Sequence, residues 1–89
     1  MLFMPNLHKN RVSPLLSRNV RVVAKRQHVS GSQYATGTRY YVTFEFTDGS
    51  REEFSVTGGV YGQIAEGDRG TLHSQGTWYK GFDRFLDTY

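Results

Sequence analysis

Apolar and polar residues alternate in the middle of the chain, and this pattern predicts β-strands. Residues 40–47 (YYVTFEFT) carry a tyrosine, a valine and two phenylalanines on one face and mainly polar residues on the other, which is typical of a strand with one buried side. Residues 19–28 alternate more weakly and place Val20, Val22 and Ala24 on the expected core side. Each segment is therefore predicted to form one strand that faces a hydrophobic core.

The connections on either side of the second strand differ in kind. Residues 30–38 (SGSQYATGT) are small and polar and include two glycines, so we expect a long mobile loop there. After the strand, a two-residue loop would place Phe54 on the polar side of the sheet. A loop over residues 47–49 keeps Phe54 with the apolar set and puts Gly49 at the left-handed position that such loops require. This register pairs Phe46 with Ser50, Val42 with Phe54 and Tyr40 with Val56.

Residues 60–76 (VYGQIAEGDRGTLHSQG) are predicted to form a corner of the domain. Apolar residues at helical spacing indicate one or two helical turns, which Gly67 would close in the left-handed conformation. Asp68 to Gly70 would then turn the chain into a fourth strand, and Gly76 would turn it into a fifth. The residues expected to form the turns and this corner of the core are Gly49, Tyr61, Gly62, Gly67, Asp68, Gly70 and Gly76.

Five short strands with one helical turn after the third predict an all-β fold. The expected architecture is a small five-stranded, partly closed β-barrel, either OB-like or SH3-like. Gly81, inside the fifth strand, indicates a bulge that would let Tyr79 and Phe82 both face inward. The predicted organisation is a basic flexible arm or linker over residues 1–18, the barrel domain over residues 19–85 and a C-terminal tail over residues 86–89.

The basic residues are concentrated in the first half of the chain. Residues 1–44 contain seven basic residues and no acidic residue, whereas residues 45–89 contain four basic and eight acidic residues, for a net charge of +3. Such asymmetry indicates either a solvated arm or a contact with an anionic neighbour, such as a lipid surface or nucleic acid. The residues predicted to meet an anionic surface are Lys9, Arg11, Arg18, Arg21, Lys25 and Arg26.

Residue types and spacings argue against an enzyme, a metal site and a cofactor site. The chain has no cysteine, and its three histidines lack the spacing of paired metal ligands. The glycines near residue 62 lack the Lys-Ser/Thr pair of a phosphate-binding loop, and the following Asp68 would repel a phosphate group. None of the serines lies in a nucleophile-elbow motif. We therefore expect no catalytic, metal-binding or cofactor-binding residues.

Single-stranded nucleic acid is the alternative ligand. Small barrels bind single strands by stacking bases on aromatic rings next to cations. Tyr41 and Trp78, with Arg21, Lys25 and Arg39, would supply such a surface if the two rings are exposed. The competing interpretation is that these aromatic side chains pack at the rims of the barrel.

Six segments of the chain form a recognisable pattern. They are residues 22–26 (VVAKR), 40–44 (YYVTF), 48–54 (DGSREEF), 61–72 (YGQIAEGDRGTL), 75–77 (QGT) and 81–84 (GFDR), within a match over residues 13–84. In order and spacing they resemble the bacterial family called domain of unknown function 2500. The resemblance implies a short protein with a β domain and brings no known catalytic or ligand-binding residues.

The resemblance also implies association with a membrane, because members typically begin with one transmembrane helix ahead of the β domain. Only MLFM precedes Pro5, which indicates either that the anchor is missing from this chain or that this is a soluble member of the family. We expect the anchor to be missing and the chain as given to be soluble. The basic residues that follow would then lie beside anionic lipid and favour the cytoplasmic side. The expected function is a non-enzymatic binding or scaffolding module whose partner is an anionic membrane surface, another protein or both.

Overall fold

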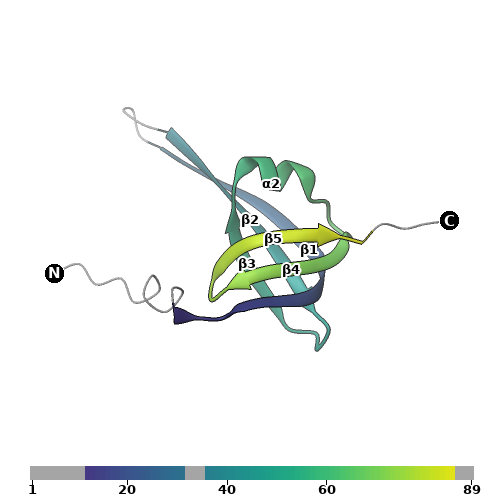
Figure 1. Cartoon of the computed structure of the whole chain (residues 1–89). Coiled ribbons are helices and arrows are strands. Elements are labelled where there is room, and N and C mark those ends of the chain that lie inside the picture. Colours follow the sequence, from purple (N-terminus) through teal and green to yellow (C-terminus); the bar gives the residue numbers. More distant parts are fainter. Residues whose placement is uncertain (1–11, 32–35, 86–89) are drawn as a thin grey trace.

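The computed structural model describes residues 12–31 and 36–85, and it consists of one antiparallel five-stranded sheet and one short helix (Figure 1). In chain order the elements are β1 (Leu15–Gly31), β2 (Thr36–Phe46), β3 (Arg51–Val56), α2 (Gly58–Gln63), β4 (Arg69–Gln75) and β5 (Trp78–Arg84). The strand order is β3-β2-β1-β4-β5, so β3 and β5 are the two edges and the sheet is not closed between them. The prediction of a small all-β domain with one helix after the third strand is confirmed. No helix of the described residues is long and apolar enough to cross a bilayer.

β1 is the central strand, and it begins earlier than predicted. Its first residues pair with β4, starting with Leu15 opposite Gln75, so residues 15–18 are part of the sheet rather than of an arm. The predicted start at residue 19 is wrong because these first residues are mostly exposed and do not alternate, which leaves no local pattern to detect. Residues 1–11 of the predicted arm and residues 86–89 of the predicted tail lie outside the described part of the chain.

The second half of β1 and the first half of β2 form a two-stranded ribbon that projects beyond the rest of the sheet (Figure 1). Pairing continues as far as Gly31 opposite Thr36, so the loop predicted over residues 30–38 is mostly strand, and that prediction is wrong. The outer part of the ribbon is exposed and is held in register by backbone hydrogen bonds rather than by a buried face. Residues 32–35 lie outside the described part.

A bulge at Val23 reverses the two faces of β1. The β2 residues opposite Val22 and Ala24 are adjacent in sequence, so Val23 is the extra residue of this pair of strands. Val22 is buried as predicted, but beyond the bulge Ala24 is exposed and Lys25 turns toward the core side. The predicted burial of Ala24 is therefore wrong, because one added residue shifts the two-residue period by half a cycle.

The predicted register between β2 and β3 is confirmed. Val42 lies opposite Phe54, and the N–H of Phe46 donates to the carbonyl oxygen of Ser50 at 2.8 Å. Gly49 has a φ of +87°, the left-handed conformation that the three-residue loop requires. The apolar residues of both strands therefore face one core.

The predicted corner is present, with changes in detail. Thr57 begins α2, since its Oγ1 accepts the N–H of Val60 at 3.2 Å. Gly67 has the predicted left-handed conformation, with φ +93°, but it lies in the turn after α2 rather than at the end of the helix. Tyr61 packs against the core, and Asp68 Oδ2 accepts the N–H of Ala65 at 2.9 Å.

One of the predicted turn glycines has another role. Gly76 does adopt positive φ, at +59°, in the turn between β4 and β5, and Gly62 lies in α2, within the predicted helical turns. Gly70, in contrast, lies inside β4, so its predicted place in the turn before that strand is wrong. Gly70 instead permits close contact between strands, because a Cβ atom there would lie 2.2 Å from the carbonyl oxygen of Asp83.

The core lies on the concave side of the sheet and is centred on Phe44, which is fully buried. Phe44 contacts β5 from across the core, with ring centroids 6.4 Å from Tyr79 and 5.6 Å from Phe82. Both rings reach the core because Lys80 is an extra residue in β5. Lys80 lies next to Gly81, where the bulge was predicted, so that prediction is confirmed. The buried apolar residues are Val20, Val22, Val42, Phe44, Phe46, Phe54, Ile64 and Leu72.

Candidate functional site

A row of charged side chains crosses the outer, convex face of the sheet. Cross-strand pairing places Arg51 of β3 opposite Glu45 of β2, Glu45 opposite Arg21 of β1, and Arg21 opposite Arg69 of β4. The preceding residue of β1, Val20, is buried, so the four charged side chains lie on the solvent side. We call Arg51, Glu45, Arg21 and Arg69 the outer-face row.

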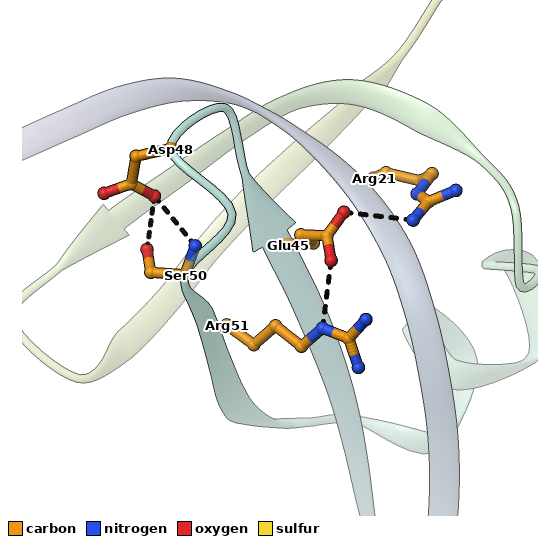
Figure 2. A network of polar contacts seen from close by, with 5 residues as sticks. All are labelled: Arg21, Glu45, Asp48, Ser50 and Arg51. Carbon is orange, nitrogen blue, oxygen red and sulfur yellow. Dashed lines mark hydrogen bonds and ion pairs between the residues drawn. The ribbon is translucent and has the colours of Figure 1, made fainter.

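Glu45 is the carboxylate of the outer-face row, and two arginines share it (Figure 2). Its Oε2 accepts a hydrogen bond from Arg51 Nε and its Oε1 accepts one from Arg21 Nη2, each at 3.0 Å. The bond from Arg51 contributes most to holding the pKa of Glu45 below its ordinary value; the bond from Arg21 adds to this, and desolvation opposes it. Both carboxylate oxygens are therefore engaged.

The β2–β3 turn supports one end of this network. Asp48 Oδ1 accepts hydrogen bonds from the hydroxyl group and the N–H of Ser50, at 2.6 and 2.9 Å (Figure 2). These bonds lower the pKa of Asp48. They also hold the turn in the conformation from which Arg51 reaches back to Glu45.

Arg69 has no acidic partner among the described residues, since none of their ion pairs includes it. Three arginines and one glutamate give the outer-face row a net charge of +2. Like charges directly opposite each other on neighbouring strands destabilise a sheet. The pairing of Arg21 with Arg69 is therefore unfavourable for stability.

An open cleft of about 360 Å³ lies along the outer-face row beside Arg21 and Arg69. Asn19 and Thr47 add an amide and a hydroxyl group to its lining, and Phe85 adds an aromatic ring that is 49% exposed. We call this the outer-face cleft. It is lined by Asn19, Val20, Arg21, Glu45, Phe46, Thr47, Arg69 and Phe85.

The cations predicted to meet an anionic surface do not form one patch. Arg18 lies with its guanidinium carbon 3.9 Å from the centroid of the Phe46 ring and with Nη2 3.9 Å from Glu52. Lys25, turned inward by the bulge, lies with Nζ 4.1 Å from the centroid of the Tyr61 ring. Each of these charges therefore rests on an aromatic ring of the domain.

The charge of Arg26 is neutralised by Glu53 of β3. Arg26 donates two hydrogen bonds to Glu53, at 2.7 and 2.8 Å, and lies over the ring of Tyr41 at 4.1 Å. The pKa of Glu53 is lowered, chiefly by these hydrogen bonds, and the pKa of Arg26 is raised by the same bonds. Among the predicted cations within the described residues, Arg21 is the one that lines the outer-face cleft. Lys9 and Arg11 lie outside the described part of the chain.

The residues predicted for nucleic-acid binding are dispersed. Tyr41 lies beneath Arg26, while Trp78, at the start of β5, lies 5.2 Å from the Nζ of Lys80. Arg39 belongs to the projecting ribbon. Within the described strands, no ring contact joins Tyr41 to Trp78. A continuous stacking platform is therefore not assembled from these residues.

A line of hydrogen bonds, Ser17 to His73 to Asp83, joins β1, β4 and β5. Ser17 Oγ lies 2.7 Å from His73 Nδ1, and His73 Nε2 lies 2.8 Å from Asp83 Oδ2. The order is that of a hydrolase triad, but the side chain of Asp83 is 81% exposed, so water competes for its carboxylate. We interpret the line as a cross-strand link. The described residues also contain no group of three potential metal ligands.

The sequence did not identify four of the residues that shape the cleft. Asn19, Thr47 and Arg69 come from β1, the β2–β3 turn and β4, and Phe85 directly follows β5. Arg69 meets Arg21 only because β1 pairs with β4, which is about fifty residues away in the chain. The sequence offered only the two arginines themselves as a signal for the cleft, because the pairing of their strands cannot be derived from the local pattern of residues.

Acid is expected to destabilise the domain. The pKa values of Glu45, Asp48 and Glu53 are lowered by their hydrogen bonds in the folded state. Their stabilising effect is therefore present above the unfolded-state pKa and is lost as the pH falls through the folded-state pKa. The unfolding temperature should change little near neutrality and fall below about pH 4.5. Circular dichroism between pH 7 and pH 2 measures this, and Glu45→Gln should show a smaller acid-induced loss than the parent chain; a midpoint unchanged down to pH 2 would contradict the prediction.

Comparison with known proteins gives a family and a fold. The profile of a family described as "Protein of unknown function (DUF2500)" matches residues 2–83. A crystal structure from Proteus penneri is similar with a TM-score of 0.74 at 21% identity, over 84% of this chain and 100% of that chain. The X-ray crystal structure of a DUF2500 protein from Klebsiella pneumoniae is similar with a TM-score of 0.71 at 27% identity, over 80% of this chain and 97% of that chain. No curated protein matches the chain significantly.

Proposed function

Because the chain belongs to the DUF2500 family of proteins of unknown function, we propose from its structure that it is a non-enzymatic binding module held at a bacterial membrane. Its outer face is the contact surface, and an anionic group on the membrane or on a partner is the target. The single observation that carries this proposal is Arg21 directly opposite Arg69, with one glutamate shared between Arg21 and Arg51. A surface that only had to be stable would alternate charges at these positions.

The distribution of the remaining charges also supports the outer face as the contact surface. Arg18, Lys25 and Arg26 are engaged with rings or carboxylates of the domain. Of the predicted cations that the structure describes, Arg21 is the one that lies in the outer-face cleft, beside Arg69. Lys9 and Arg11 precede β1 in the sequence and, by this proposal, add to the same contact. Each basic residue close to an anionic membrane contributes roughly 1 kcal/mol of binding. A few such residues give a weak contact that complements a separate attachment rather than replacing it.

The proposal predicts charge-dependent binding to vesicles. We expect the chain to co-sediment with vesicles rich in phosphatidylglycerol at low salt, because added salt screens exposed charge contacts. Phosphatidylcholine vesicles carry no net charge, so they should not bind the chain. Replacing Lys9 and Arg11 together by glutamine should weaken binding by about tenfold or more. The matched control is Lys80→Gln together with Arg39→Gln, which removes the same charge from β5 and the ribbon.

Equal binding to neutral and anionic vesicles would overturn the proposed membrane contact, and so would equal losses in the two double variants. Fluorescence titration with labelled single-stranded oligonucleotides addresses the alternative. Binding to phosphate groups of nucleic acid must weaken steeply with salt. A flat titration at low salt is the result we expect, whereas salt-sensitive binding would replace the membrane proposal with a nucleic-acid function.

A further inference from the structure

We propose that the outer-face cleft binds the phosphate group of a phosphate monoester, with Arg69 as its principal ligand and Arg21 as the second. This inference rests on the proposed binding role of the outer face and names the chemistry that this face recognises. It concerns one defined site, whereas the membrane contact above depends on the summed charge of the surface.

The charge of the cleft favours an anion. Two arginines and Glu45 in its lining give a net charge of +1. Arg51, which engages the second oxygen of Glu45, brings the outer-face row to +2, so each oxygen of the one carboxylate is held by an arginine of the row. Arg69 has no acidic partner among the described residues and lies directly opposite Arg21. A phosphate monoester carries a charge close to −2 at neutral pH and presents three acceptor oxygens. Bound between Arg21 and Arg69, it would replace a repulsive contact by two attractive ones.

The donors around the two arginines suit phosphate oxygens. A guanidinium group presents five N–H donors in a planar fork, which favours two-pronged contacts with phosphate. Asn19 Oδ1 accepts a hydrogen bond from the hydroxyl group of Thr71 at 3.2 Å, so its amide nitrogen remains available as a donor. The hydroxyl group of Thr47, on the other side of the cleft, is a further donor. Each of these groups lies on a strand of the sheet or on the β2–β3 turn.

An apolar part of the cleft favours an organic ester over inorganic phosphate. The ring of Phe85 is about half exposed and lines the cleft next to Arg69, whose carbonyl oxygen accepts the N–H of Phe85 at 2.8 Å. A flat or aliphatic group attached to the phosphate would therefore lie against Phe85, as apolar surfaces do when water is displaced between them.

Phenyl phosphate is a suitable probe, because it combines a phosphate monoester with one ring. In a ¹H–¹⁵N correlation titration we expect saturable shifts of the amides of Asn19, Arg21, Arg69 and Phe85, with a Kd in the millimolar range for a solvent-exposed site. Arg69→Gln should weaken binding about tenfold, the lower end of the effect of losing charge-assisted hydrogen bonds. Arg39→Gln removes the same charge from the ribbon and should leave the Kd within about twofold. Phenol, which lacks the phosphate, should produce no saturable shifts at these amides.

Two results would overturn the inference: shifts that do not saturate or that lie elsewhere, and equal losses in Arg69→Gln and Arg39→Gln. Thermal unfolding gives an independent readout, because removing one of two opposed arginines should leave Arg69→Gln at least as stable as the parent chain. A clear loss of stability would mean that Arg69 has a structural role and would also count against the site.

The source of the phosphate is distinguished by a second arm with vesicles. If a lipid headgroup is the source, phosphatidate vesicles bind more tightly than phosphatidylglycerol vesicles of equal charge, and Arg69→Gln removes the difference. If a soluble ester is the source, phenyl phosphate binds but the two kinds of vesicle are equivalent. Phenyl phosphate binding without any vesicle binding would overturn the membrane role and leave the site intact. If vesicle binding is unchanged in Arg69→Gln and phenyl phosphate causes no shifts, the phosphate site is overturned and the membrane role remains.

Discussion

Replacing Gly70 by alanine is expected to destabilise the domain by more than about 3 kcal/mol, which is a large part of the stability of a small protein. A Cβ atom at this position would lie 2.2 Å from the carbonyl oxygen of Asp83 and 2.9 Å from the Cα atom of Arg84. Both atoms belong to the backbone of β5, which is paired with β4 at this point. Backbone cannot rotate away as the end of a side chain can, so the two strands must separate.

Urea unfolding followed by circular dichroism measures the effect of Gly70→Ala. The matched control is Gly62→Ala, since a Cβ atom there meets nothing within 4 Å and Gly62 lies in α2. Alanine in a helix is favoured over glycine by roughly 0.5–1 kcal/mol, so this variant should be slightly stabilised. Equal midpoints for the two variants would show that β4 and β5 can move apart at little cost and would refute the prediction.

Truncation of Phe44 to alanine is expected to cost about 3–5 kcal/mol. Phe44 is fully buried, and its ring is the point where the two halves of the sheet meet across the core. It contacts Phe54 of β3 at a centroid distance of 5.9 Å, and it contacts Phe82 of β5 at 5.6 Å. Because β3 and β5 are not paired by a ladder, these ring contacts link the two edges of the open sheet.

Truncation of a phenylalanine at the surface provides the control. Phe85 is 49% exposed, so Phe85→Ala should change the free energy of unfolding by less than about 1 kcal/mol. Chemical denaturation of both variants tests the difference. If Phe44→Ala were no more destabilised than Phe85→Ala, the ring contacts across the core would not be what holds the sheet in its curved form.

Elements made by neighbouring parts of the chain could be predicted from the sequence. The alternation in residues 40–47 determined which side chains are buried, and the parity of Phe54 then determined the loop length and the place of Gly49. The bulge beside Gly81 followed from two aromatic residues that could face one core only if an extra residue stood between them. In each case the evidence lay within a few residues of the feature.

Features that depend on distant partners could not be predicted. The start of β1 at Leu15 depends on pairing with β4, and the ribbon depends on backbone hydrogen bonds between exposed residues. The bulge at Val23 has no glycine or proline to indicate it. It nevertheless decides that Ala24 faces solvent and Lys25 the core side.

The charge pattern shows the same limit. The sequence predicted a basic first half and an acidic second half, yet folding places the carboxylates of β2 and β3 against the arginines of β1. Within the described residues, what remains is a local excess of positive charge around Arg21 and Arg69. Candidate anion contacts could be listed from the sequence, but the choice among them required the strand register.

The central position of β1 has a consequence for synthesis of the chain. Residues 20–31 of β1 can pair with β2 as soon as β2 emerges, whereas residues 15–19 pair only with β4, more than fifty residues later. At roughly 5–20 residues per second, the first part of β1 stays unpaired for several seconds on the ribosome. Closing so long a loop also slows refolding of the complete chain. The strand that comes first in the sequence is therefore among the last to be completed in the fold.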